Sequence, residues 1–77
     1  MNTQRVIDAL IRIIGENVKR MGIVEGNHIR IPADAIPTLV HLSKEQAFRE
    51  LGISRTREMG KTLVSLIEDL IKTQQDA

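Results

Sequence analysis

Apolar residues in the first twenty positions recur at spacings of three and four, which is the period of an α-helix. This pattern predicts an N-terminal helix over residues 1–21, which Asn2 or Thr3 can cap and Gly22 can terminate. Gly15 lies inside the predicted helix and costs it about 1 kcal/mol relative to alanine. It marks either a close approach by another backbone or a weak point, and we favour the second. The apolar stripe consists of Ile7, Leu10, Ile11, Ile14, Val18 and Met21.

The pattern changes to strict alternation between residues 22 and 32. His28, Ile29, Arg30 and Ile31 alternate polar with apolar, as a short half-buried strand does, and Pro32 ends the run. With the turn-like residues 25–27 before it, this segment predicts a minor β-hairpin or strand near residues 22–31. Two isolated strands are marginal in water, so the element must pack on helices or pair with a second ribbon. The isoleucines would face the core, and His28 and Arg30 would point outward.

Residues 37–51 predict two short helices. Pro37 suits the first turn of a helix covering Thr38–Leu42. Ser43, with Gln46 three positions later, matches the capping-box pattern, which predicts a new helix from Lys44 to Leu51. Gly52 then fits the residue that follows a helix C-terminus.

The last helix is predicted from about Arg55 to Lys72, with Ser54 as its cap and a frayed polar tail at 73–77. Its apolar arc is wider than the arc of about 100° on a monomer's surface helix. The first helix has a similar surplus in Val6 and Ile13. We therefore expect a homodimer, the alternative being that the last helix is the central element of a small bundle. The predicted dimer interface comprises Leu63, Leu66, Ile67, Leu70 and Ile71.

Together these segments predict one all-α (α-rich) domain over residues 1–77: four helices with the minor β element, and a helical region over 37–72. Apolar residues at 42% and charged residues at 27% are typical of a folded globular chain. Eleven isoleucines and seven leucines against the single aromatic Phe48 predict an aliphatic core. No apolar run approaches the ~20 residues of a membrane span, so we expect no membrane association and a cytoplasmic location.

Candidate catalytic and metal-binding chemistry is sparse. The absence of cysteine excludes disulfides, zinc–thiolate clusters and thiol nucleophiles. His28 and His41 have no neighbouring ligands in the sequence that would complete a metal site. The segment Gly60-Lys61-Thr62 resembles the end of a phosphate-binding loop, but Arg55 stands where that loop needs its first glycine. We expect no enzymatic activity, no cofactor and no metal.

One stretch, residues 44–61, resembles a helix-turn-helix corner: a helix, the turn Gly52-Ile53-Ser54 and a further helix. In such a corner Gly52 supplies the left-handed bend and Ile53 fills the angle beneath it. The resemblance implies that the opening turn of the second helix meets the major groove of DNA. The residues then available to phosphates and base edges are Arg55, Thr56, Arg57 and Lys61.

Charge along the chain favours the same corner. The total is only +1, yet residues 43–63 carry five basic against three acidic side chains, and residues 64–77 carry one against three. Arg55 and Arg57 lie in the opening turn of the last predicted helix, where a positive side chain is unfavourable next to the positive end of the helix dipole. A helix with a purely structural role more often begins with acidic residues. The pattern departs from the motif in two places. Phe48 stands where the helix-turn-helix motif has a small residue. Glu58 stands where the motif has an apolar residue, and the nearest apolar residue, Met59, comes one position later.

Three interpretations of function follow. The first is a small dimeric DNA-binding protein, such as a transcriptional regulator, that uses the corner. A second DNA-binding geometry, which resembles ribbon-helix-helix dimers, would insert paired strands containing His28 and Arg30 into the groove. The third is an adaptor or inhibitor that grips a protein partner through its aliphatic helix faces and binds no DNA. Charge reversal at Arg55 and Arg57 separates the first interpretation from the third.

Overall fold

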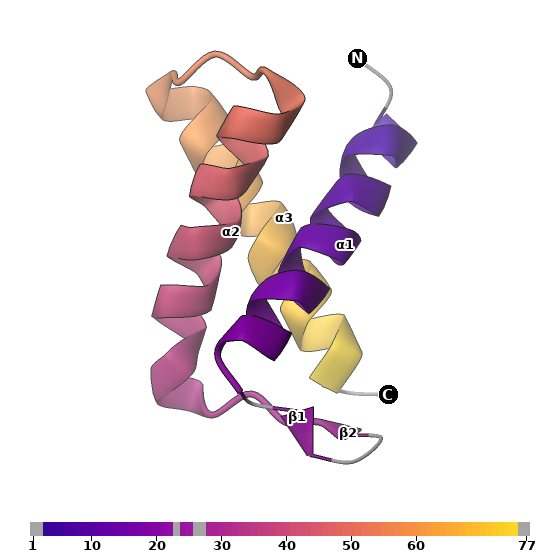
Figure 1. Cartoon of the computed structure of the whole chain (residues 1–77). Helices are drawn as coiled ribbons and strands as arrows, with labels where there is room; N and C mark the ends of the chain where they lie inside the picture. Colours follow the sequence, from indigo (N-terminus) through magenta and orange to yellow (C-terminus); the bar gives the residue numbers. More distant parts are fainter. Residues whose placement is uncertain (1–2, 23, 26–27, 76–77) are drawn as a thin grey trace.

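In the computed structural model, which describes residues 3–22, 24–25 and 28–75, three α-helices form the body of the molecule (Figure 1). The fold is all-α, as predicted. Two strands of two residues each and a short 3-10 turn connect the first helix to the second. The elements are α1 (Thr3–Arg20), β1 (Val24–Glu25), β2 (His28–Ile29), the 3-10 turn η1 (Ala33–Ala35), α2 (Ile36–Leu51) and α3 (Arg57–Gln75).

The first helix follows the predicted pattern closely. After α1 ends at Arg20, Gly22 adopts a left-handed φ of 71°, and its N–H donates to the carbonyl of Lys19 at 3.1 Å. This conformation is readily available only to glycine, so Gly22 is the predicted stop. A Cβ added at Gly15 would meet nothing within 4 Å. Gly15 is therefore a weak point of α1 and not a site of close backbone approach.

The prediction of two short helices over residues 38–51 is wrong, because α2 is continuous from Ile36 to Leu51. Ser43 and Gln46 do not form a capping box. Ser43 is completely buried within α2, and the Nδ2 of Asn17 on α1 donates to its hydroxyl at 3.4 Å. The four-helix prediction thus becomes three α-helices. Pro37 does lie in the first turn of α2, as expected.

The junction between α2 and α3 differs from the prediction by two residues. Gly52 has a left-handed φ of 62° and ends α2, as predicted. However, α3 begins at Arg57, so Ser54 is not its cap and Arg55 lies in the turn. The cap is Thr56, whose Oγ1 accepts a hydrogen bond from the N–H of Met59 at 3.0 Å. At its other end α3 continues through Gln75, beyond the predicted end at Lys72.

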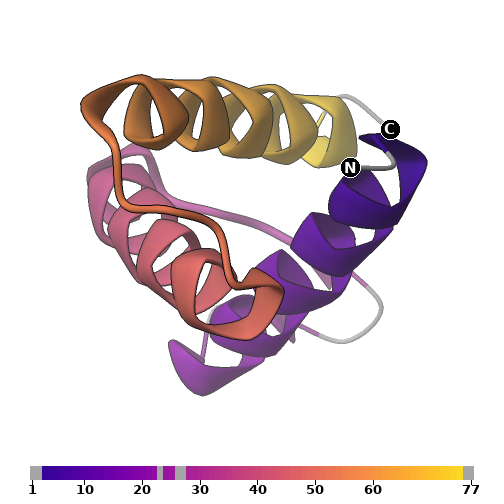
Figure 2. The same cartoon turned by 90° about the horizontal axis from the view of Figure 1, so that it is seen from above.

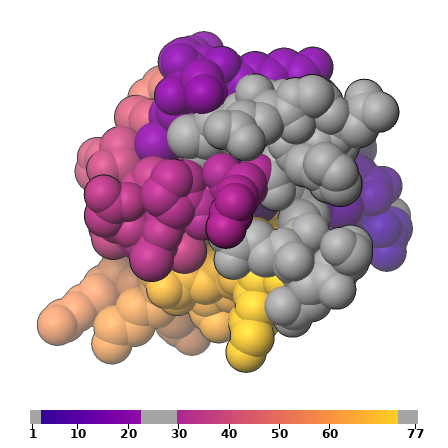
Figure 3. Space-filling view, turned by 90° about the horizontal axis from the view of Figure 1, so that it is seen from below, coloured from indigo at the N-terminus to yellow at the C-terminus, as the bar shows by residue number. Residues whose placement is uncertain are grey.

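The ribbon between α1 and α2 pairs Val24 with Ile29 and Glu25 with His28 in antiparallel register. With two residues a side it adds no sheet layer to the helical fold. Ile31 is buried beyond it and Arg30 is exposed, whereas the side-chain directions predicted for residues 28 and 29 lie outside the described part of the chain. Seen from below, the start of α2 and the last turns of α3 are both at this end of the molecule (Figure 3).

All three helices contribute to one aliphatic core, with α3 packed against both α1 and α2 (Figure 2). Leu63, Ile67 and Ile71 on α3 are at most 2% exposed, and Ile13 on α1 is fully buried. Much of the apolar arc that predicted a dimer is therefore used within one chain, because α3 has two helical neighbours. The core residues are Leu10, Ile13, Ile14, Val18, Ile31, Leu39, Val40, Ala47, Phe48, Ile53, Leu63, Ile67 and Ile71.

A line of polar contacts joins α1 to α2 beside this core. Asn17 is 1% exposed, and its Nδ2 also donates to the Oε1 of Gln46 at 3.2 Å. Arg12 pairs with Glu16 on its own helix and with Glu50 on α2. The hydrogen bonds from Arg12 hold the pKa of both carboxyls below its ordinary value. Because these charges are exposed, they orient α2 against α1 more than they stabilise the fold.

Candidate functional site

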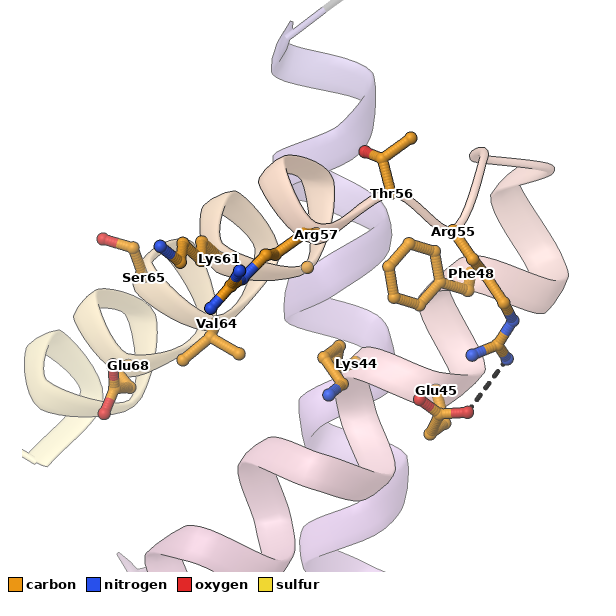
Figure 4. Close-up of a pocket in the computed structure, with 11 residues that line it drawn as sticks. Lys44, Glu45, Phe48, Arg55, Thr56, Arg57, Lys61, Val64, Ser65 and Glu68 are labelled. Atoms are coloured by element: carbon orange, nitrogen blue, oxygen red, sulfur yellow. Dashed lines mark ion pairs between the residues drawn. The ribbon is translucent and has the colours of Figure 1, made fainter.

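An open hollow of about 550 Å³ lies between α2 and α3, beside the turn that joins them (Figure 4). We call it the α2–α3 hollow. It contains the four residues that the helix-turn-helix-like corner predicts to contact DNA, together with others from both helices. Its lining comprises Lys44, Glu45, Phe48, Arg55, Thr56, Arg57, Gly60, Lys61, Val64, Ser65 and Glu68.

The wall contributed by α3 follows from the helical period. Arg57, Lys61, Ser65 and Glu68 are spaced by three or four residues, so they lie along one face of α3. Arg57 and Lys61 belong to the first two turns, and Glu68 stands further along the helix (Figure 4). The positive charge of this wall is therefore concentrated at the N-terminal end of α3.

Arg55 is held by α2 instead of projecting from the opening turn of α3. Its Nη2 lies 2.9 Å from the Oε1 of Glu45, and its guanidinium lies 4.9 Å from the centre of the Phe48 ring (Figure 4). The hydrogen bond between the two side chains raises the pKa of Arg55 and lowers that of Glu45. Phe48, which stands where a helix-turn-helix has a small residue, is buried as part of the core. The ring supports the arginine that ties the turn to α2.

Thr56 also has a structural role. Besides the hydrogen bond from Met59 to its side chain, its carbonyl accepts one from the N–H of Gly60 at 3.0 Å. Thr56 therefore sets where α3 begins and, with that, the direction in which Arg57 and Lys61 leave the helix. Ile53, within the turn, is 8% exposed and belongs to the core.

Three cations at the hollow take no part in an ion pair within the described part of the chain: Lys44, Arg57 and Lys61. Arg57 and Lys61 extend from α3, and Lys44 lies across from them on α2 (Figure 4). Of the two carboxylates at the hollow, Glu45 is engaged by Arg55, which leaves Glu68. The arrangement can attract an anion at the end of the hollow nearest the turn.

The structure thus brings the four predicted residues together but divides their roles. Arg57 and Lys61 are exposed and available, whereas Arg55 and Thr56 hold the turn. Lys44 was missed by sequence reasoning, although it lies in the same basic stretch. The sequence pattern placed it at the start of a helix from Lys44 to Leu51, and the helix-turn-helix resemblance assigned DNA contacts only to the turn and the start of α3.

Two further observations concern the rest of the described chain. No three His, Cys, Asp or Glu side chains are gathered so as to hold a metal ion in the described residues. None of the described helices is both long and apolar enough to cross a membrane.

Comparisons with protein-family models, with curated proteins and with solved structures gave no match. A second surface feature is an apolar depression of about 160 Å³ between α1, the turn and α3. Its lining includes Val6, Ile53, Met59 and Leu66. Leu66 and Leu70, one turn apart on α3, are half-buried against the core.

Proposed function

We propose that this protein is a small DNA-binding protein that contacts duplex DNA through the N-terminal turns of α3. The observation that carries the proposal is the group of three cations around the α2–α3 hollow that have no ion-pair partners among the described residues, Lys44, Arg57 and Lys61. A protein gains much of its affinity for DNA by neutralising phosphates and releasing their counterions. Unpaired cations serve this purpose because no internal ion pair must first be broken.

The four residues of the corner have two roles. Arg57, at the first position of α3, and Lys61, one turn further, are the candidates for phosphate contacts, because both side chains border the hollow. Arg55 and Thr56 act as positioning residues, because their own side chains are engaged by Glu45, Phe48 and the backbone of Met59.

A dimer remains part of the proposal. Two-fold pairing would present two α3 N-termini to half-sites one helical turn, about 34 Å, apart. Leu63, Ile67 and Ile71 are buried within one chain, so the pairing surface would consist of the half-buried Leu66 and Leu70 with the apolar depression. The paired-strand geometry is less favoured, because β2 already pairs with β1 of its own chain.

A titration of a fluorescent mixed-sequence duplex tests the proposal. At about 50 mM salt we expect saturable binding with two chains per duplex, and each neutralised phosphate should contribute about −0.9 to the slope of log K against log salt. Absence of binding at tens of micromolar protein would contradict the proposal, and a slope near zero would exclude the cations as its basis.

The second candidate function is that of an adaptor or inhibitor that binds a protein partner. The apolar depression and the half-buried Leu66 and Leu70 favour it, because contiguous apolar surface on a small domain often marks an interaction site. This function needs none of the cations at the hollow. Substitutions there separate the two candidates.

A further inference from the structure

We infer that the α2–α3 hollow seats one phosphate group, and that Lys44 contacts it from α2 opposite Arg57 and Lys61 on α3. The inference rests on the proposed function for the source of the phosphate, which is then the backbone of a nucleic acid strand. It assigns to α2 a binding residue outside the corner's opening turn. It also predicts that the hollow contributes affinity and register, while base reading is left to the outer face of α3.

The shape of the site is the first argument. A helix that enters a major groove presents its outer, convex face to the base edges. Lys44, Arg57 and Lys61 instead border a concavity, with Val64 and Phe48 as its apolar lining. Its volume of about 550 Å³ lies in the range of small-ligand sites, so it can admit a phosphate with its adjoining sugar. Because the cations come from both α2 and α3, they can contact a phosphate that enters between the two helices.

The distribution of charge is the second argument. Glu45 is paired with Arg55 at 2.9 Å and is also within reach of the charge of Lys44, so its repulsion of an anion in the hollow is reduced. Glu68 stands on α3 beyond Val64, away from the turn (Figure 4). An anion is therefore attracted at the turn end and repelled at the other. This polarity favours a single phosphate near Lys44 over a row of phosphates along α3.

The position of Lys44 in α2 is the third argument. Ser43, the residue before it, is buried against α1, which fixes the rotation of α2 at this level. Lys44 is half-buried at the edge that faces α3 and has no ion-pair partner among the described residues. A lysine whose stem is partly packed loses less side-chain freedom on binding than a fully exposed one.

The test compares Lys44→Gln with Lys72→Gln in the full chain. Lys72 is exposed near the end of α3 and does not line the hollow. We expect Lys44→Gln to weaken duplex binding about 10-fold at ~50 mM salt. The slope of log K against log salt should become shallower by about 0.9 for each phosphate that the variant no longer neutralises. The weakening should be equal for duplexes of different sequence, and Lys44→Arg should restore binding. Lys72→Gln should leave the affinity within 2-fold, and thermal melts of all variants check folding.

A parallel NMR titration with inorganic phosphate separates this inference from the proposed function. If the protein binds duplex but Lys44→Gln behaves like Lys72→Gln, the phosphate seat is wrong and the proposed function stands. If the duplex does not bind while inorganic phosphate shifts the resonances of Lys44, Arg57 and Lys61, the seat is supported and its source is a free phosphate. In that case the proposed function is wrong. If neither binds, both are overturned.

Discussion

Replacement of Ile67 by alanine is expected to lower the free energy of unfolding by about 2–5 kcal/mol, the usual cost of emptying a buried aliphatic site. Ile67 is fully buried on α3, in the core formed by all three helices. A chain of this length has a total stability of roughly 4–12 kcal/mol, so the variant should be near the limit of folding. Urea unfolding followed by circular dichroism measures the change.

Ile11→Ala is the matched control, because Ile11 is 43% exposed on α1 and its replacement removes the same atoms. We expect it to change the free energy of unfolding by no more than about 0.5 kcal/mol. The reverse order, with Ile11→Ala the more damaging, would mean that the exposed side of α1 is covered by another chain. The assignment of Ile67 to the core of a single chain would then be wrong.

The second large effect is expected on DNA binding, from the double variant Arg57→Glu with Lys61→Glu. Removing two cations that bind phosphates costs about 100-fold or more in affinity at ~50 mM salt, and the two new carboxylates add repulsion. The fold should tolerate the change, since both side chains are exposed and a glutamate at the start of α3 suits the helix dipole. Anisotropy titrations against the same duplex measure the change in affinity.

Arg5→Glu with Lys19→Glu provides the control for net charge. Both residues are exposed on α1 and neither lines the α2–α3 hollow. This variant should bind duplex within about 5-fold of the unmodified protein, because general repulsion is weak at distances beyond the Debye length. Equal weakening in the two double variants would show that binding depends on total charge and not on the hollow.

The features that sequence reasoning predicted are those that local physics determines. The apolar periodicity located α1 and α3, and Gly22 and Gly52 were recognised as helix stops because only glycine adopts a left-handed φ readily. Pro37 was placed correctly because its fixed φ suits a first helical turn.

The errors arise where tertiary contacts override local signals. Ser43 has the sequence context of a cap, yet its burial against Asn17 keeps α2 continuous. Arg55 was expected in the opening turn of α3, yet it lies before α3, where Phe48 and Glu45, seven and ten residues earlier, engage it. Lys44 lies in the first helix of the helix-turn-helix-like stretch, where the motif predicts no DNA contact. Lys44 lies beside Arg57 and Lys61 only because α2 packs against α3. That packing depends on tertiary contacts, which cannot be inferred from the spacing of residues in the sequence.

The central claim is that the α2–α3 hollow is the surface that meets nucleic acid, and chemical-shift mapping of the protein during addition of duplex DNA tests it most directly. The account predicts that the largest changes occur at Lys44, Arg57, Lys61 and Ser65, with small changes at Leu66 and Leu70. Changes centred on the apolar depression, or none at saturating duplex, would contradict it.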